Sequence, residues 1–367
     1  MKGLHIADLH LDRPFEGIHF YDESLMERLS QSSEQLLRNI ENLAFEENVD
    51  AVFYVGDNFH QLPVSLGIQK RWQQHLQHLI EAGIQPFVVF GNHDYNKAGQ
   101  MMMPEEVIYW DSEKVETKYW TTRNFERVAI SAFSYQHPHL TRHMASQFPP
   151  RDCSVDYHIG LYHGQTSGNY APFRLDSLGQ KQYDYWALGH IHQSESLAER
   201  IYYPGTPQGK TRKDFNKGRV ILFELQADTC HVEWVDIAPV HYEIKNIESP
   251  PYRWQYDGLE LLDIPTSVSG VESAISKGSI EEFVQSISPV DTDKFVIGIK
   301  ESQPSLHLEA KLQEELCHHY QQEDIFVDLL SAFKDTKYKP FIQQLVQERK
   351  EIVKQALCSF DCDLQGD

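Results

Sequence analysis

The chain has 367 residues, of which 41% are hydrophobic and 24% are charged, and its formal net charge at pH 7 is -21. This composition is ordinary for a globular protein and excludes wholesale disorder, and the length suits about two domains. The negative charge disfavours a protein that binds nucleic acid through its overall electrostatic field. Bound divalent cations or a partner subunit could, however, reverse the sign of the charge locally.

The run of apolar residues near the N-terminus is too short for the hydrophobic region of an export signal. No apolar stretch approaches the length of a membrane span. We therefore expect a cytoplasmic protein that does not associate with membranes. The five cysteines are widely spread and none forms a CxxC pair. This spacing argues against a disulfide framework or a zinc ribbon.

The first quarter of the chain alternates between strand and helix signals. Continuous apolar runs predict buried strands, and apolar residues at helical spacing predict helices between them. The predicted elements are a strand at 3–8, a helix at 34–45, a strand at 51–60, a helix at 68–80 and a strand at 87–90. This order is typical of a layered α/β core.

The remainder of the chain has a different pattern of secondary-structure signals. Short strand signals separated by turns fill residues 119–225 and predict a second, largely antiparallel half. Beyond a boundary near residues 238–248, mixed helix and strand signals predict a small α+β unit, and an amphipathic helix follows at the C-terminus. The predicted domains are residues 1–238, 239–335 and 336–367.

Side chains suited to metal binding follow five of the predicted strands. Each could belong to a turn, because Gly, Asn and Asp are common turn residues. Together, however, they form an oxygen and imidazole set that suits Mn, Fe, Zn or Mg, and a two-metal site needs a bridging carboxylate with about three further ligands for each ion. We therefore predict a binuclear site formed by Asp8, His10, Asp57, Asn92, His163, His190 and His192.

The ordered motifs D-x-H at Asp8, G-D at Asp57, GNHD at Asn92, a later histidine and G-H-x-H at His190 resemble those of the calcineurin-like metallophosphoesterases. The resemblance implies a layered αββα core and hydrolysis of phosphoesters. It further implies that His93 is the general acid; a structural His93 bonded to Asp94 is the alternative. The implied ligands are Asp8, His10, Asp57 and His192 for one metal, and Asp57, Asn92, His163 and His190 for the other.

The surroundings of these motifs resemble the SbcD-type branch of DNA repair exonucleases, and most closely its YhaO-type members. His60 lies in GDNFH, where many other branches carry a second aspartate, and DLHLDRPF and YYPGTPQG are also similar to this branch. The resemblance covers roughly residues 1–240 and, more loosely, the tail. It implies a Mn-dependent DNA nuclease in which His60 assists at the scissile phosphate.

The same resemblance implies that residues 239–335 form a capping domain that orients DNA. It also implies that the C-terminal helix docks on an SbcC-like coiled-coil ATPase, and that the chain forms a homodimer. Packing of this helix against its own core is the alternative. The chain has only a modest number of basic residues, and they are found chiefly in residues 210–219. This segment could form a DNA contact or only a solvated hairpin.

Two other functions stay open. The metal centre could serve a phosphodiesterase or phosphatase that acts on a small nucleotide or a phosphoprotein, or the chain could be a scaffold that binds metal and a partner without catalysis. A second histidine cluster, formed by His137, His139 and His143, flanks a proline. We expect it to lie in a surface loop rather than to bind a third metal.

Overall fold

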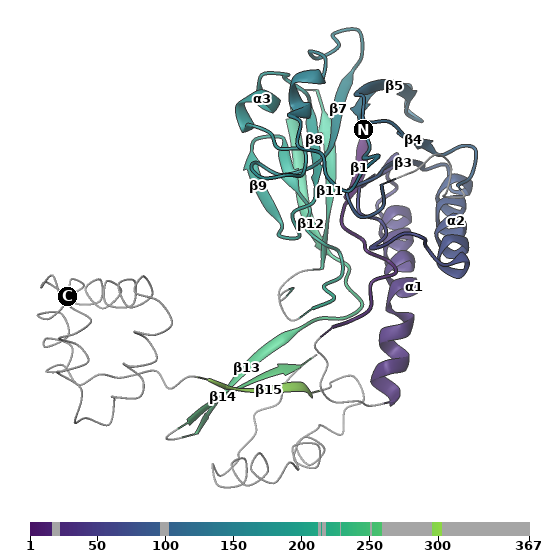
Figure 1. Ribbon diagram of the computed structural model, residues 1–367. Helices are drawn as coiled ribbons and strands as arrows, with labels where there is room; N and C mark the ends of the chain where they lie inside the picture. Colours follow the sequence, from purple (N-terminus) through teal and green to yellow (C-terminus); the bar gives the residue numbers. More distant parts are fainter. Residues whose placement is uncertain are drawn as a thin grey trace, which may run out of the picture. The chain divides into compact units, whose positions relative to one another are not determined.

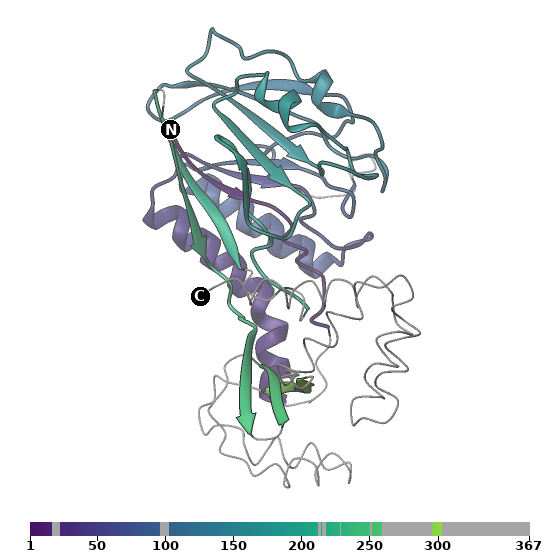
Figure 2. The same ribbon diagram turned by 90° about the vertical axis from the view of Figure 1, so that its left-hand side faces the viewer.

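The computed structural model describes residues 1–16, 23–95, 103–211, 214, 218–227, 229–249, 252–258 and 296–302. Within this part of the chain, two six-stranded sheets pack face to face, and helices cover the first of them (Figures 1 and 2). This arrangement positions the candidate site.

The first sheet has the strand order β12-β11-β1-β2-β3-β4. Its strands β1 to β4 are parallel, and β11 and β12 extend the sheet from β1 in antiparallel register. The predicted alternation of strands and helices is confirmed here. The elements are β1 (Lys2–Ile6), α1 (Glu23–Glu46), β2 (Ala51–Val55), α2 (Leu66–Glu81), β3 (Gln85–Val89), β4 (Ile108–Tyr109), β11 (Arg219–Gln226) and β12 (Thr229–Asp236).

The second sheet has the order β5-β6-β7-β8-β10-β9. The prediction of a largely antiparallel half was wrong, because β6, β7, β8 and β10 pair in parallel and only the outer strands β5 and β9 are antiparallel. Its elements are β5 (Glu116–Thr121), β6 (Arg127–Ala132), η1 (Met144–Gln147), β7 (Tyr157–His163), α3 (Leu175–Gly179), β8 (Tyr185–Gly189), β9 (Glu195–Ala198) and β10 (Ile201–Tyr203). The long connections before β7 and β8 allow crossovers, which parallel pairing requires.

Side chains along β2 show how the layers are held together. Val52 and Tyr54 pack toward α1 and α2, whereas Phe53 and Val55 pack between the two sheets. A strand covered on both faces is apolar throughout, which explains the unbroken run of hydrophobic residues. A third apolar cluster, which includes Trp186, covers the outer face of the second sheet together with η1 and α3. The predicted layered α/β sandwich fold is confirmed.

A separate three-stranded antiparallel sheet comprises β13 (Glu243–Ser249), β14 (Tyr252–Gly258) and β15 (Val296–Ser302). It falls within the predicted capping domain, residues 239–335. The rest of that domain and the amphipathic helix predicted in residues 336–367 lie outside the described residues, so both domain assignments stay predictions. In the described part of the chain, no helix combines the length and the apolar character that a bilayer-spanning segment needs.

Candidate metal centre

All seven predicted ligands lie at or just beyond the C-terminal ends of parallel strands. They follow β1, β2 and β3 of the first sheet and β7 and β8 of the second. The loop after β1 runs beside the loop after β2, because Asp8 N donates to Gly56 O at 3.1 Å and His10 N donates to Asp57 O at 3.0 Å. The two sheets thus bring ligands from both halves of the chain to one edge of the sandwich.

Asp8, His10 and His192 form the first group, in which one ligand atom of each lies within 4.8 Å of the others. The Nε2 atoms of His10 and His192 are 3.2 Å apart, and His192 Nε2 lies 4.0 Å from Asp8 Oδ1. Asp57 Oδ2 lies 3.9 Å from His10 Nε2. These four residues are the set predicted for one metal.

Asp57, His163 and His190 form the second group. Asp57 Oδ2 lies 3.5 Å from His163 Nε2. Asn92 Oδ1 is 3.1 Å from the same His163 atom and 3.0 Å from His190 Nδ1. Because the same Asp57 oxygen faces both groups, the geometry matches the predicted bridging carboxylate.

Four of these residues have left-handed backbones, with φ of 54° at Asp8, 43° at His10, 52° at Asp57 and 97° at His190. Residues other than glycine disfavour the left-handed region of backbone conformation. Such conformations concentrate at functional sites, where the surrounding structure maintains them. Each turns the chain sharply at a strand end. The strain therefore falls on the residues that converge on the centre.

Three glycines, Gly56, Gly91 and Gly189, each precede a candidate ligand and allow the close approach of the strand ends. A Cβ atom at Gly91 would lie 2.2 Å from Asp57 Oδ1, and one at Gly189 would lie 2.1 Å from the carbonyl oxygen of Val55. Neither position has room for a side chain. Glycine at these positions is thus a packing requirement of the cluster.

The electrostatics of the centre favour cation binding. Burial lowers the pKa of His10 well below its ordinary value and lowers that of His190 to about 3, so both imidazoles are neutral near pH 7 and retain a lone pair. Burial also acts to lower the pKa of His163, but the Asp57 carboxylate outweighs it and raises this pKa to about 9. A bound cation would replace the His163 proton beside Asp57.

The donor set therefore fits two divalent ions. The Nε2 atoms of His10 and His192 face each other at hydrogen-bond distance, Asn92 Oδ1 lies at hydrogen-bond distance from His163 and His190, and carboxylate oxygens complete both groups. His10 Nδ1 is buried without a hydrogen-bond partner in the described part of the chain. Ligation by the seven residues stays a prediction that the geometry supports.

His93 and His60 lie beside the first group. The backbone N–H of His93 donates to Asp57 Oδ1 at 2.9 Å, and its Nδ1 lies 2.8 Å from the carbonyl oxygen of His60. The ring centroid of His93 is 5.1 Å from that of His10. Asp94, the alternative partner of His93, instead accepts bonds from Gly91 N at 2.6 Å and from the Asn58 and Asp57 backbones.

Sequence reasoning missed three supporting residues. Asp12 accepts hydrogen bonds from His60 N and Gln61 N, and Gln165 Oε1 lies 3.2 Å from His190 Nε2. Asp94 organises the backbone around Asp57. The period-2 spacing of Asp8, His10 and Asp12 was a usable signal for Asp12, whereas the local sequence around Gln165 carries no comparable signal.

The second histidine cluster is exposed, as expected. His137 lies 2.9 Å from Glu113 Oε1, and the ring of His139 lies against that of Tyr170, with centroids 5.4 Å apart. His143 is also exposed and precedes η1. These interactions identify a surface loop.

A family model described as calcineurin-like phosphoesterase matches residues 1–194. With this match and the layered fold, the chain belongs to the calcineurin-like phosphoesterases, a family that uses divalent metals.

Individual proteins are also similar to this chain. It is 34% identical over 239 residues to the uncharacterized metallophosphoesterase YhaO of Bacillus subtilis, which covers 62% of this chain and 58% of YhaO. It is 23% identical over 295 residues to the DNA double-strand break repair protein Mre11 of Methanopyrus kandleri, covering 70% of this chain and 61% of that protein. Mre11 of Sulfurisphaera tokodaii is 25% identical over 196 residues, covering 52% and 48%. The chain thus spans about half to three fifths of the length of these relatives.

Proposed function

We propose that the protein is a Mn-dependent DNA nuclease. It hydrolyses phosphodiester bonds at DNA ends and acts in DNA repair as the nuclease subunit of a complex with an SbcC-like ATPase. The observation that carries the proposal is the His60–His93 pair beside the two ligand groups. The similarity to the two Mre11 proteins supports the choice of DNA as substrate.

The residues of the chain divide the chemistry between them. The two groups would hold divalent ions, which would supply Lewis acidity to activate water and neutralise charge on the phosphoryl oxygens. His93 Nδ1 donates to the His60 carbonyl, so the transferable proton of the protonated ring is on Nε2. His93 gives this proton to the leaving oxygen, and the bond from its backbone N–H to Asp57 fixes its position relative to the ligands.

His60 contributes in two ways. Its backbone carbonyl orients the His93 ring, and its side chain stacks on that ring at a centroid distance of 4.8 Å. The backbone of His60 is in turn held by Asp12. The side chain of His60 is half-buried at the edge of the centre, where it contacts the DNA backbone at the scissile phosphate.

The partner proposal accounts for the charge. With a net charge of -21, the chain has little general attraction for DNA, and the SbcC-like ATPase would supply the cationic surface. The C-terminal helix predicted in residues 336–367 is the proposed docking segment. The manganese requirement and homodimerisation belong to the same proposal.

The acidic charge also favours a second candidate, a phosphodiesterase or phosphatase that acts on a small nucleotide or a phosphoprotein. A small substrate needs no extended cationic surface. Fast turnover of such a compound by the chain alone, with DNA left intact even in the presence of the ATPase partner, would select this function.

Digestion of end-labelled linear DNA in Mn²⁺ tests the proposal. The wild-type chain, alone or with its ATPase partner, should shorten the DNA, and His93→Ala should abolish the shortening. His143→Ala, which removes an exposed histidine distant in sequence from the ligands, is the matched control and should cleave like wild type. Intact DNA under all of these conditions would refute the nuclease assignment.

A further inference from the structure

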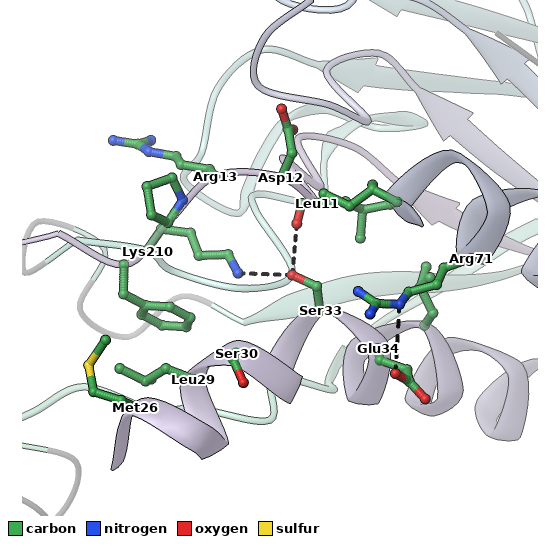
Figure 3. A pocket seen from close by; sticks show the side chains of 14 residues that line it. Leu11, Asp12, Arg13, Met26, Leu29, Ser30, Ser33, Glu34, Arg71 and Lys210 are labelled. Atoms are coloured by element: carbon green, nitrogen blue, oxygen red, sulfur yellow. Dashed lines mark hydrogen bonds and ion pairs between the residues drawn. The ribbon is translucent and has the colours of Figure 1, made fainter. Parts of the chain in front are cut away.

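A pocket of about 450 Å³ is lined by residues that directly follow the candidate ligand His10 in the chain (Figure 3). It is formed by the loop that follows His10, by one face of α1, by α2 residues and by Lys210. Small-molecule sites have volumes of roughly 300–1,000 Å³, so this pocket is large enough for a ligand. The lining residues used below are Phe15, Met26, Leu29, Ser33, Arg71 and Lys210.

Lys210 is the unusual member of this pocket. Only 3% of its surface is exposed, which corrects the interpretation of its loop as a solvated hairpin at this residue. Its Nζ atom lies 3.4 Å from Ser33 Oγ and 4.4 Å from the centroid of the Phe15 ring. Among the described residues, no carboxylate lies within 4.0 Å of this ammonium group. A buried cation is costly, and burial lowers the pKa of Lys210 to about 8, although the Asp12 carboxylate acts to raise it.

Two further groups converge with Lys210. Figure 3 shows the Lys210 ammonium and the Arg71 guanidinium pointing toward the Ser33 hydroxyl from opposite sides. The ion pair of Arg71 with Glu34 is long, at 3.8 Å, and half-exposed, so it competes weakly for the guanidinium. Two cations and a hydroxyl around one space form a suitable site for a phosphate group.

The wall of the pocket that begins beside Lys210 is apolar. Phe15, Met26 and Leu29 line it, and Met26 is 44% exposed although it carries a large apolar side chain. An aromatic ring and a polarisable thioether favour a flat aromatic ligand group. A phosphate site joined to an apolar surface has the character of a nucleotide site.

We propose that this pocket binds one nucleoside monophosphate unit, with its phosphate at Lys210, Ser33 and Arg71 and its base against Phe15, Met26 and Leu29. The inference rests on the proposed nuclease function, since the unit is assigned to the DNA strand that flanks the scissile phosphate. The connection to the metal centre is direct: Ser33 Oγ donates at 2.8 Å to the carbonyl oxygen of Leu11, the residue after His10. Residues 10 and 11 of one loop thus join the candidate metal centre to the pocket.

Calorimetric titration of the full-length chain with dTMP in EDTA measures the pocket without the metals. Wild type should bind dTMP more tightly than inorganic phosphate, and Lys210→Met should weaken dTMP binding at least about ten-fold. Lys70→Met makes the same charge change at an exposed α2 position outside the pocket lining, and it should bind like wild type. Ser30→Trp fills the pocket from an exposed position on α1 and should also weaken dTMP binding. If Lys210→Met fails to fold, this second variant still tests whether dTMP binds in the pocket.

Competition then distinguishes a strand position from a site for free nucleotide. In Mn²⁺, dTMP should inhibit cleavage of a single-stranded oligonucleotide competitively, at the concentration at which it occupies the pocket in EDTA. Binding without inhibition would overturn the strand assignment, and equal affinity for dTMP and phosphate would overturn the nucleotide assignment. If the chain digests DNA but does not bind dTMP, the nucleotide pocket is refuted and the proposed nuclease function stands. If the chain binds dTMP but does not digest DNA, the nucleotide pocket stands and the proposed nuclease function is refuted.

Discussion

The rings of His60 and His93 are stacked, with centroids 4.8 Å apart and planes inclined by 20°, and the His60 carbonyl oxygen lies 2.8 Å from His93 Nδ1. The carbonyl holds the His93 ring in the orientation that the proposed general acid role needs. It leaves Nε2 as the nitrogen available to a leaving group.

Removal of His93 should have an effect that depends on the leaving group. A general acid matters most when the departing oxygen is strongly basic, so His93→Ala should slow cleavage of a phenyl phosphodiester by roughly 10²–10⁴-fold and a nitrophenyl ester less. His60→Phe keeps the stack and the carbonyl and should lose about ten-fold or less. Steady-state kinetics on both esters make the comparison, and equal losses for both leaving groups in His93→Ala would exclude the acid role.

Asp94→Asn should destabilise the protein and weaken metal binding. The Asp94 carboxylate is buried and accepts bonds from the Gly91, Asp57 and Asn58 backbones and from Asn58 Nδ2. An amide NH2 would face donors, at a cost on the order of 2–4 kcal/mol. Chemical denaturation and Mn²⁺ titration measure the two effects, and Asp176→Asn, at an exposed position of α3, is the control. Wild-type stability in Asp94→Asn would show that this carboxylate does not organise the loops.

Gly91→Ala should abolish metal binding, because the added methyl group would overlap the Asp57 carboxylate. At Gly67, near the start of α2, an added methyl group would meet no atom within 4 Å, so Gly67→Ala should leave metal binding unchanged and alter stability by less than about 1 kcal/mol. Mn²⁺ binding isotherms for both variants provide the comparison. Normal binding by Gly91→Ala would contradict the packing of the centre.

The convergence of the candidate ligands could be predicted from sequence because their pattern is local. Apolar runs that end in Asp57 and Asn92 mark strand ends, and parallel strands place their carboxyl ends at the same edge of a sheet. The α1 helix was predicted too short: only residues 34–45 showed clear apolar spacing, whereas the helix begins at Glu23. Its first turns carry mostly polar side chains, so periodicity could not reveal them.

Features that depend on distant segments could not be predicted. Strand patterns specify which side chains are buried but not which strand pairs with which, so the parallel centre of the second sheet and the pairing of β11 with β1 were missed. The burial of Lys210 also depends on contact with Ser33, which is distant in sequence. A lysine among other basic residues otherwise indicates a solvated loop.

His5 should make stability dependent on pH. This residue is buried between the sheets, with ring nitrogens 3.0 Å from Tyr185 Oη and 2.9 Å from the Leu188 carbonyl oxygen, and burial lowers its pKa to about 3. The unfolded chain therefore takes up a proton below about pH 6.5 that the folded chain does not, so this stability is complete above pH 6.5 and is lost as the pH falls toward 3.

The difference between wild type and His5→Gln isolates this contribution. Between pH 7.5 and 5.5, in EDTA, wild type should lose about 1.4 kcal/mol more unfolding free energy than the variant. Urea denaturation at the two pH values measures the loss. Equal pH dependence of the two proteins would show that His5 is protonated in the fold or that its pKa is unshifted.

We propose above all that Asp57 joins two metal ions into one hydrolytic centre, and Mn²⁺ stoichiometry tests this role most directly. Equilibrium dialysis followed by elemental analysis should find two Mn²⁺ per wild-type chain. Asp57→Asn should hold at most one and lose phosphodiesterase activity. Two ions in the variant, or one ion in a fully active wild-type chain, would contradict the binuclear centre.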